Sequence, residues 1–125
     1  MSRLMSVAFT EQAVRDRRKT VTRRKGWLFA KPGDRITLCR KVMGRKKGEP
    51  LERIVDVEIV SVRREPLLAL TMDYTYGQHE VILEGFLGDL DPVDFVDRYF
   101  VDAQGMKPED EVTRIEWRYL DGEVA

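Results

Sequence analysis

Residues 17–24 of this chain read Arg-Arg-Lys-Thr-Val-Thr-Arg-Arg, so five cations and two hydroxyls surround one apolar residue, Val21. Like charges at this density repel one another, and a fold accommodates them most readily where an anionic partner neutralises them. The stretch therefore predicts a loop that either forms one wall of a cleft for a nucleic acid or nucleotide, or lies in solvent. Because Lys19 and Thr22 are three residues apart, a turn or an extended segment can bring their ammonium and hydroxyl groups to one site.

The net charge of zero conceals a division of the chain by charge. Residues 1–64 hold 18 Lys and Arg and 7 Asp and Glu, whereas residues 65–125 hold 4 and 15. Either the basic half presents a positive face to a partner such as RNA, or the two halves interleave in the fold and their charges pair.

Length and composition predict one domain over residues 1–125, large enough to form a core without disulfides. The single cysteine, Cys39, excludes an internal disulfide and a multi-cysteine zinc site, and we expect a buried thiol. The single histidine, His79, has no second His or Cys as a co-ligand, so we expect neither a metal nor a cofactor. The sequence contains no run of eighteen apolar residues and no signal peptide, so we expect no membrane contact and a cytoplasmic location.

Hydrophobic periodicity predicts both strands and helices. We expect strands at 5–9, 35–42, 54–62 and 112–119, and the shift of the apolar phase at Val60 predicts either a β-bulge or a bend of the strand round a barrel corner. We expect helical segments at 11–17, 67–72 and 78–84, the last ended by Gly85, and a further helix starting at Asp91-Pro92. In that helix Phe95, Val96, Tyr99 and Phe100 have the spacing of a buried face.

Several residues outside the Lys19–Thr22 pair are candidate contacts to a nucleic acid. Trp27 follows the basic stretch and is either a core residue or a base-stacking platform. The loop from Gly44 to Gly48 carries three consecutive cations that either contact phosphates or increase solubility. The complete set of candidates is Arg17, Arg18, Arg23, Arg24, Trp27, Arg45, Lys46, Lys47 and Tyr76.

Four motifs in order give the chain a resemblance to the ASCH domain family, whose fold is similar to that of the RNA-binding PUA domains. The motifs are Lys-Thr-Val-Thr-Arg-Arg at 19–24, Lys-Pro-Gly-Asp at 31–34, Glu-Gly-Phe at 84–86 and Val-Thr-Arg-Ile-Glu-Trp at 112–117. Each motif is weak alone, but their order and spacing are fairly specific and cover nearly the whole chain. The version with the Gly44–Gly48 loop resembles ASCH proteins of actinobacterial phages, which implies the cytoplasm of a bacterial or phage-infected cell.

The resemblance implies an α+β, PUA-like fold, a small mixed β-barrel with flanking short helices. Family members are linked to RNA binding, one branch hydrolyses the amide of N4-acetylcytidine nucleosides, and another member is reported as a ribonuclease. The hydrolase branch uses a lysine, a threonine three residues later and a distant glutamate, which fall here on Lys19, Thr22 and Glu84, with Glu80 as the alternative. That branch has a glycine two residues before its lysine, where this chain has Arg17.

The residues are compatible with two main functions. In amide hydrolysis the Thr22 hydroxyl is the nucleophile, and Lys19 is its base if neighbouring cations lower the lysine pKa. In a binding module, which is the broader expectation, the same cleft holds RNA or a modified nucleoside without any chemistry. A metal-assisted nuclease built on Asp73, Glu80, Glu84 or Asp89 is a third alternative without a recognised spacing.

Overall fold

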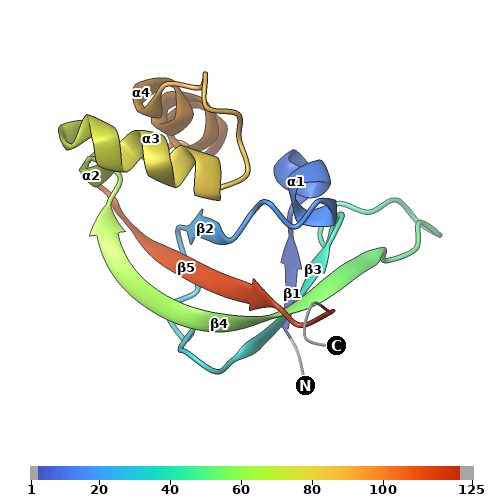
Figure 1. Cartoon of the computed structure of the whole chain (residues 1–125). Helices are drawn as coiled ribbons and strands as arrows, with labels where there is room; N and C mark the ends of the chain where they lie inside the picture. The colour runs from blue at the N-terminus through green and yellow to red at the C-terminus, as the bar shows by residue number, and fades with distance from the viewer. Residues whose placement is uncertain (1–2, 122–125) are drawn as a thin grey trace.

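The computed structural model describes residues 3–121, which form one curled sheet flanked by short helices (Figure 1). The strands are β1 (Arg3–Ser6), β2 (Val21–Arg24), β3 (Arg35–Cys39), β4 (Arg53–Pro66) and β5 (Glu111–Tyr119). They are ordered β1-β3-β4-β5-β2, with β1 parallel to β3 and the other pairs antiparallel. The long β4 and β5 bend into half a barrel, which confirms the predicted α+β fold with a small mixed barrel.

The strand predictions hold for the long strands and fail for two short ones. The strand expected at 5–9 lies earlier, as β1, and residues Ala8–Thr10 are helical instead. The register of β4 against β5 shifts between Ile59 and Ser61, so the predicted bulge at Val60 is present. The prediction of a loop over residues 17–24 is wrong for its second half, because β2 pairs with β5 at the edge of the sheet. Alternation is hard to recognise in four residues of which two are arginine, and the pairing with β5 is a long-range contact.

The helical segments are short. They are η1 (Ala8–Thr10), α1 (Glu11–Arg15), α2 (Ala69–Met72), α3 (Tyr74–Leu83), α4 (Pro92–Val96) and the π-helical η2 (Asp97–Asp102). Helix α3 begins four residues earlier than predicted, because the Asp73 carboxylate caps it by accepting from the Tyr76 amide at 3.1 Å. Helix α4 begins as predicted, with Pro92 at its first position and the Asp91 carboxylate accepting from the Val93 amide at 2.8 Å.

The buried apolar residues form two clusters rather than one core. One cluster joins β1, β3, β4, β5 and α1, and consists of Met5, Val7, Val14, Ile36, Leu38, Val57, Ile59, Ile115 and Trp117. The other lies among the later helices and consists of Leu67, Leu70, Val81, Phe95, Val96, Phe100, Met106 and Val112. Figure 1 shows β2 between α1 on one side and the α2–α4 group on the other, so this strand runs between helices that belong to different clusters.

Candidate functional site

The site is built around Lys19, whose backbone is fixed from two sides. Its amide donates to the carbonyl of Ala13 at 3.2 Å, at the end of α1. Its carbonyl accepts from the indole nitrogen of Trp117 at 3.1 Å and from the hydroxyl of Tyr119, both on β5. The aromatic side chains of β5 therefore set the position from which the lysine side chain extends into the interior.

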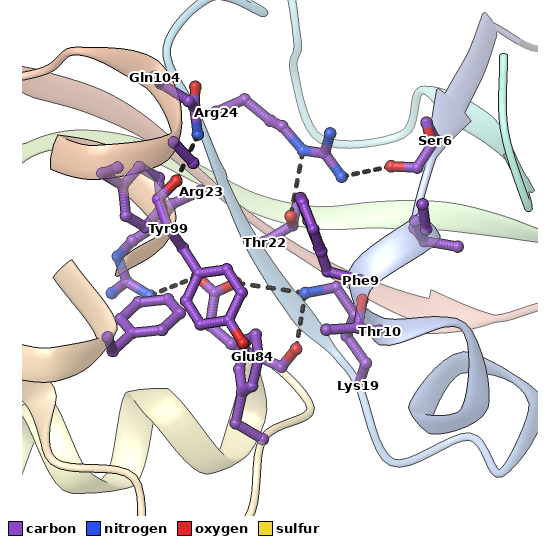
Figure 2. A pocket seen from close by; sticks show the side chains of 16 residues that line it. Ser6, Phe9, Thr10, Lys19, Thr22, Arg23, Arg24, Glu84, Tyr99 and Gln104 are labelled. Carbon is purple, nitrogen blue, oxygen red and sulfur yellow. Dashed lines mark hydrogen bonds and ion pairs between the residues drawn. The ribbon is translucent and has the colours of Figure 1, made fainter. Parts of the chain in front are cut away.

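The Lys19 side chain meets Glu84, which is 65 residues away in the sequence. Nζ donates to the Glu84 carbonyl at 2.7 Å and to carboxylate Oε1 at 3.2 Å, and both side chains are less than 5% exposed (Figure 2). Gly85 allows this approach, because it ends α3 with φ of +103° and a Cβ there would lie 2.8 Å from Cβ of Ala13 and 3.2 Å from Cβ of Lys19. Of the two glutamates considered, Glu84 is the one in contact with Lys19.

The environment lowers the pKa of Lys19 to about 8 from its ordinary 10.5. Burial is the largest cause, because it disfavours the charged form, and the cations Arg24 and Arg23 act in the same direction. Glu84 opposes these effects by attraction and by its hydrogen bond. The sequence had suggested neighbouring charge as the cause, whereas removal of the amine from water contributes more.

Thr22 and Arg24 lie together on β2 beside this pair. The Thr22 hydroxyl oxygen accepts from Nε of Arg24 at 3.2 Å, and Nη2 of Arg24 donates to the carbonyl of Ser6 at 2.8 Å (Figure 2). Within residues 3–121 the Thr22 hydroxyl donates no hydrogen bond, so its proton is available to a base. Burial lowers the pKa of Arg24 against the opposing attraction of Glu84.

These side chains line a cavity of about 320 Å³. Lys19, Thr22 and Glu84 form one part of its wall, and Figure 2 shows Tyr99 and Phe9 beside them. The rest of the wall comes largely from η1, β2, η2 and the segment after α3: Ser6, Val7, Ala8, Thr10, Arg23, Arg24, Phe86, Phe95, Phe100, Ala103 and Gln104. A concave site that combines aromatic walls with a few convergent polar groups is typical of a small-molecule pocket.

Arg23 differs from the expectation of an exposed phosphate contact. Its side chain is 0% exposed and forms ion pairs with Glu80 Oε1 at 2.5 Å, Glu84 Oε2 at 2.9 Å and Glu65 Oε2 at 3.1 Å. Burial lowers the pKa of this guanidinium, but attraction to the three carboxylates outweighs burial and the pKa lies above its ordinary value. Here the basic and acidic halves of the chain interleave and pair.

Arg17 is also in an ion pair, and its backbone conformation is unusual for an arginine. It has φ of +62°, a left-handed conformation that glycine adopts more readily than arginine. Its Nη1 donates to the Val14 carbonyl at 2.7 Å, and its Nη2 forms an ion pair with Asp121 at 2.5 Å. The guanidinium also lies over the Tyr119 ring, 5.1 Å from its centroid.

The two aromatic candidates do not line the Lys19 cavity. Trp27 packs against the first apolar cluster, 5.0 Å from the Phe29 ring, and lines a separate cavity of about 270 Å³. The Tyr76 hydroxyl donates to Glu65 at 2.8 Å and accepts from Arg23 at 3.2 Å, so it belongs to the arginine network. The remaining predicted cations are exposed and away from the cavity wall, and their contacts to a nucleic acid stay predictions: Arg18, Arg45, Lys46 and Lys47.

Sequence reasoning missed the partners of Arg23 and the aromatic wall. Arg114 on β5 was not among the candidate site residues, yet it is 5% exposed and donates to the buried Glu80 carboxylate. Phe9 is 78% exposed beside the cavity, with its ring 5.6 Å from that of Tyr99. The available signal for Arg114 was that it faces the same side as Val112, a residue of the helix-covered cluster.

Residues 3–121 hold neither a cluster of metal-ligating side chains nor a membrane-spanning helix. Those residues contain no group of three or more His, Cys, Asp or Glu side chains arranged to hold a metal ion. Every helix in the same range is too short or too polar to cross a lipid bilayer.

The fold and cavity together define a small α+β domain with a curled sheet and a pocket beside a lysine–threonine motif. No family model matches the sequence, and no curated protein matches it. The solved structure of ASCH from Zymomonas mobilis is similar, with a TM-score of 0.54 and 14% identity over 92% of this chain. This chain spans 65% of the length of that one.

Protein EF3133 from Enterococcus faecalis V583, described under the family DUF984, has a TM-score of 0.56 and 12% identity. That match covers 96% of this chain and 76% of the other. The chain therefore has the fold of an ASCH domain, as the motifs predicted. The resemblance to phage proteins stays a prediction.

Proposed function

We propose that the cavity binds a modified nucleoside and hydrolyses an acyl amide on its base, as in the N4-acetylcytidine branch that the motifs resemble. The observation that carries the proposal is the meeting of Lys19, Thr22 and Glu84 at one cavity, with Glu84 brought from 65 residues away. The lysine and threonine were identified by local spacing, but nothing local in the sequence required the glutamate to face them.

The chemistry follows from the protonation state of Lys19. With a pKa of about 8, a substantial fraction of the amine is neutral near physiological pH and can take the proton of the Thr22 hydroxyl. The threonine oxygen then attacks the amide carbonyl and forms a C–O bond. The protonated lysine gives its proton to the departing amide nitrogen of the nucleobase as the C–N bond breaks. Water then hydrolyses the resulting acyl-threonine ester.

Arg24 and Glu84 support these steps in different ways. Arg24 donates to the Thr22 oxygen, so its positive charge favours the developing alkoxide. Glu84 accepts from Lys19 and orients the amine, and its charge stabilises the ammonium that forms in the reaction. The aromatic rings of Phe9, Phe86 and Tyr99 provide apolar surface for a nucleobase.

Binding of RNA or a nucleoside without hydrolysis is the alternative. The observation that favours it is that Arg24 lines the cavity and makes no ion pair with a carboxylate within residues 3–121, so it remains available to a phosphate. Salt-dependent binding of a short RNA that weakens in Arg24→Gln, without turnover of any acylated nucleoside, would support this alternative.

The test is release of acetate from N4-acetylcytidine, ribo and deoxy, followed by mass spectrometry. We expect turnover by the unaltered protein and none by Lys19→Ala or Glu84→Gln, with folding checked by circular dichroism. Equal turnover by both variants would refute the proposed roles. No turnover by the unaltered protein would leave ligand binding as the function of the cavity.

A further inference from the structure

Arginines occupy directly paired positions on three neighbouring strands. The strand register pairs Arg114 of β5 with Arg63 of β4 on one side and with Arg23 of β2 on the other. Paired residues of antiparallel strands point to the same face, so these three side chains form a row. Three side chains of helix α3 and its C-terminal cap contact Arg23 in this row, and they are four residues apart: Tyr76, Glu80 and Glu84.

Contacts within this layer hold Arg23 in place. Its Nη2 donates to Glu80 Oε1 at 2.5 Å. Arg114 holds the same glutamate by two bonds, from Nε to Oε1 at 2.5 Å and from Nη2 to Oε2 at 3.1 Å. Because Glu80 is fixed by Arg114, and Glu65 accepts from Arg23 at 3.1 Å, the guanidinium has a defined position beside Glu84.

The carboxylate of Glu84 is divided between two cations. Oε2 accepts from Nη1 of Arg23 at 2.9 Å, and Oε1 accepts from Nζ of Lys19 at 3.2 Å. We propose that Arg23 is a positioning residue, which holds one oxygen of Glu84 and so limits how strongly that carboxylate keeps Lys19 protonated. A role of Arg23 in catalysis rests on the function proposed above, whereas the effect of Arg23 on the protonation of Lys19 does not depend on that function.

The groups around Lys19 define the direction of the effect. Glu84 approaches from the end of α3, Arg23 and Arg24 from β2, and Trp117 from β5, with its ring centroid 5.9 Å from Nζ. The Tyr119 hydroxyl contacts the lysine carbonyl, and Tyr99 of η2 lines the same cavity. Removing Arg23 removes a repelling cation and releases the carboxylate to Lys19, so both consequences favour the ammonium form.

The test is an NMR titration of lysine side chains labelled with ¹³C, in which Lys19→Met assigns the Lys19 signal. In Arg23→Gln we expect Lys19 to titrate about one pH unit higher than in the unaltered protein. Arg63→Gln is the matched control, because Arg63 contacts Glu65 and Tyr76 but not Glu84, and it should leave the Lys19 titration unchanged. An unchanged or lower Lys19 pKa in Arg23→Gln would overturn the proposal.

The double variant Arg23→Gln/Glu80→Gln covers the case in which Arg23→Gln alone does not fold, because it removes one cation and one carboxylate together. The same rise in the Lys19 pKa is expected there, and its absence counts equally against the proposal. The titration needs no substrate, so it tests the effect of Arg23 on Lys19 even if the protein does not hydrolyse N4-acetylcytidine. If hydrolysis occurs, a rise of one unit should lower turnover at pH 7 up to about tenfold, with recovery at higher pH. A pH–rate profile unchanged by Arg23→Gln would contradict the link to catalysis.

Discussion

The stability of the protein should rise with pH in a way that depends on Lys19. The folded protein holds Lys19 with a pKa of about 8, whereas an unfolded lysine titrates at its ordinary 10.5. Between these values the unfolded chain binds more protons than the folded one, so the free energy of unfolding increases as pH rises. Below the folded pKa the full penalty of burying the ammonium is present.

The size of the effect follows from the two pKa values. Protonation equilibria at about 8 and 10.5 give an increase of roughly 2 to 3 kcal/mol in the free energy of unfolding between pH 7 and pH 10. Lys19 is 3% exposed on its side chain, so solvent screens this contribution little. In Lys19→Met the increase should be absent, because methionine fills similar space without a titrating group.

Urea denaturation of the two proteins at pH 7, 8, 9 and 10 measures the difference. Comparison with Lys19→Met removes the contributions of other groups that titrate in this range, including tyrosines whose pKa burial raises. Parallel pH dependences in the two proteins would refute the argument that burial, rather than Glu84, dominates the environment of Lys19.

Three substitutions test how the chain positions the site. Gly85→Ala should lower the free energy of unfolding by about 2 kcal/mol and reduce turnover, because a side chain at positive φ is strained and would push the end of α3 away from Lys19. Urea denaturation and acetate release measure the two effects, and a fully active variant would contradict the prediction. Gly77→Ala should lower the free energy of unfolding by about 3 kcal/mol, since its Cβ would lie 1.9 Å from a backbone carbonyl oxygen of the neighbouring helix α2. A melting temperature within about a degree of that of the unaltered protein would contradict this close packing. Arg17→Gly should change the free energy of unfolding by less than about 1 kcal/mol, because relief of strain offsets loss of an exposed ion pair; a larger loss would show that the guanidinium contacts matter more than the backbone.

Features that depend on local pattern could be predicted from the sequence. The Asp91-Pro92 helix start, the bulge near Val60 and the glycine end of α3 each arise from a few adjacent residues, and each is present. The ASCH-type fold could also be predicted, because four weak motifs occur in the right order. The pairing of Lys19 with Glu84 came from the resemblance and not from the pattern.

Features that depend on long-range pairing could not be predicted. Arg23 and Arg24 are adjacent and chemically alike, yet Arg23 lies among three buried glutamates and Arg24 beside the cavity. Alternation along β2 separates them, but β2 was not recognised as a strand, because its partner β5 is about ninety residues away. Because Glu80 holds Arg23, the second half of the basic stretch is a strand with a buried arginine, whereas Arg18 in the first half stays exposed.

Release of acetate from N4-acetylcytidine by Thr22→Val, compared with the unaltered protein, tests the central claim most directly. Valine keeps the shape of threonine at a position that is 3% exposed, and it removes the hydroxyl that we assign as nucleophile. The account predicts turnover by the unaltered protein and none by Thr22→Val, while a ligand-binding titration shows that the variant still binds the nucleoside. Turnover by Thr22→Val at the rate of the unaltered protein would contradict the account.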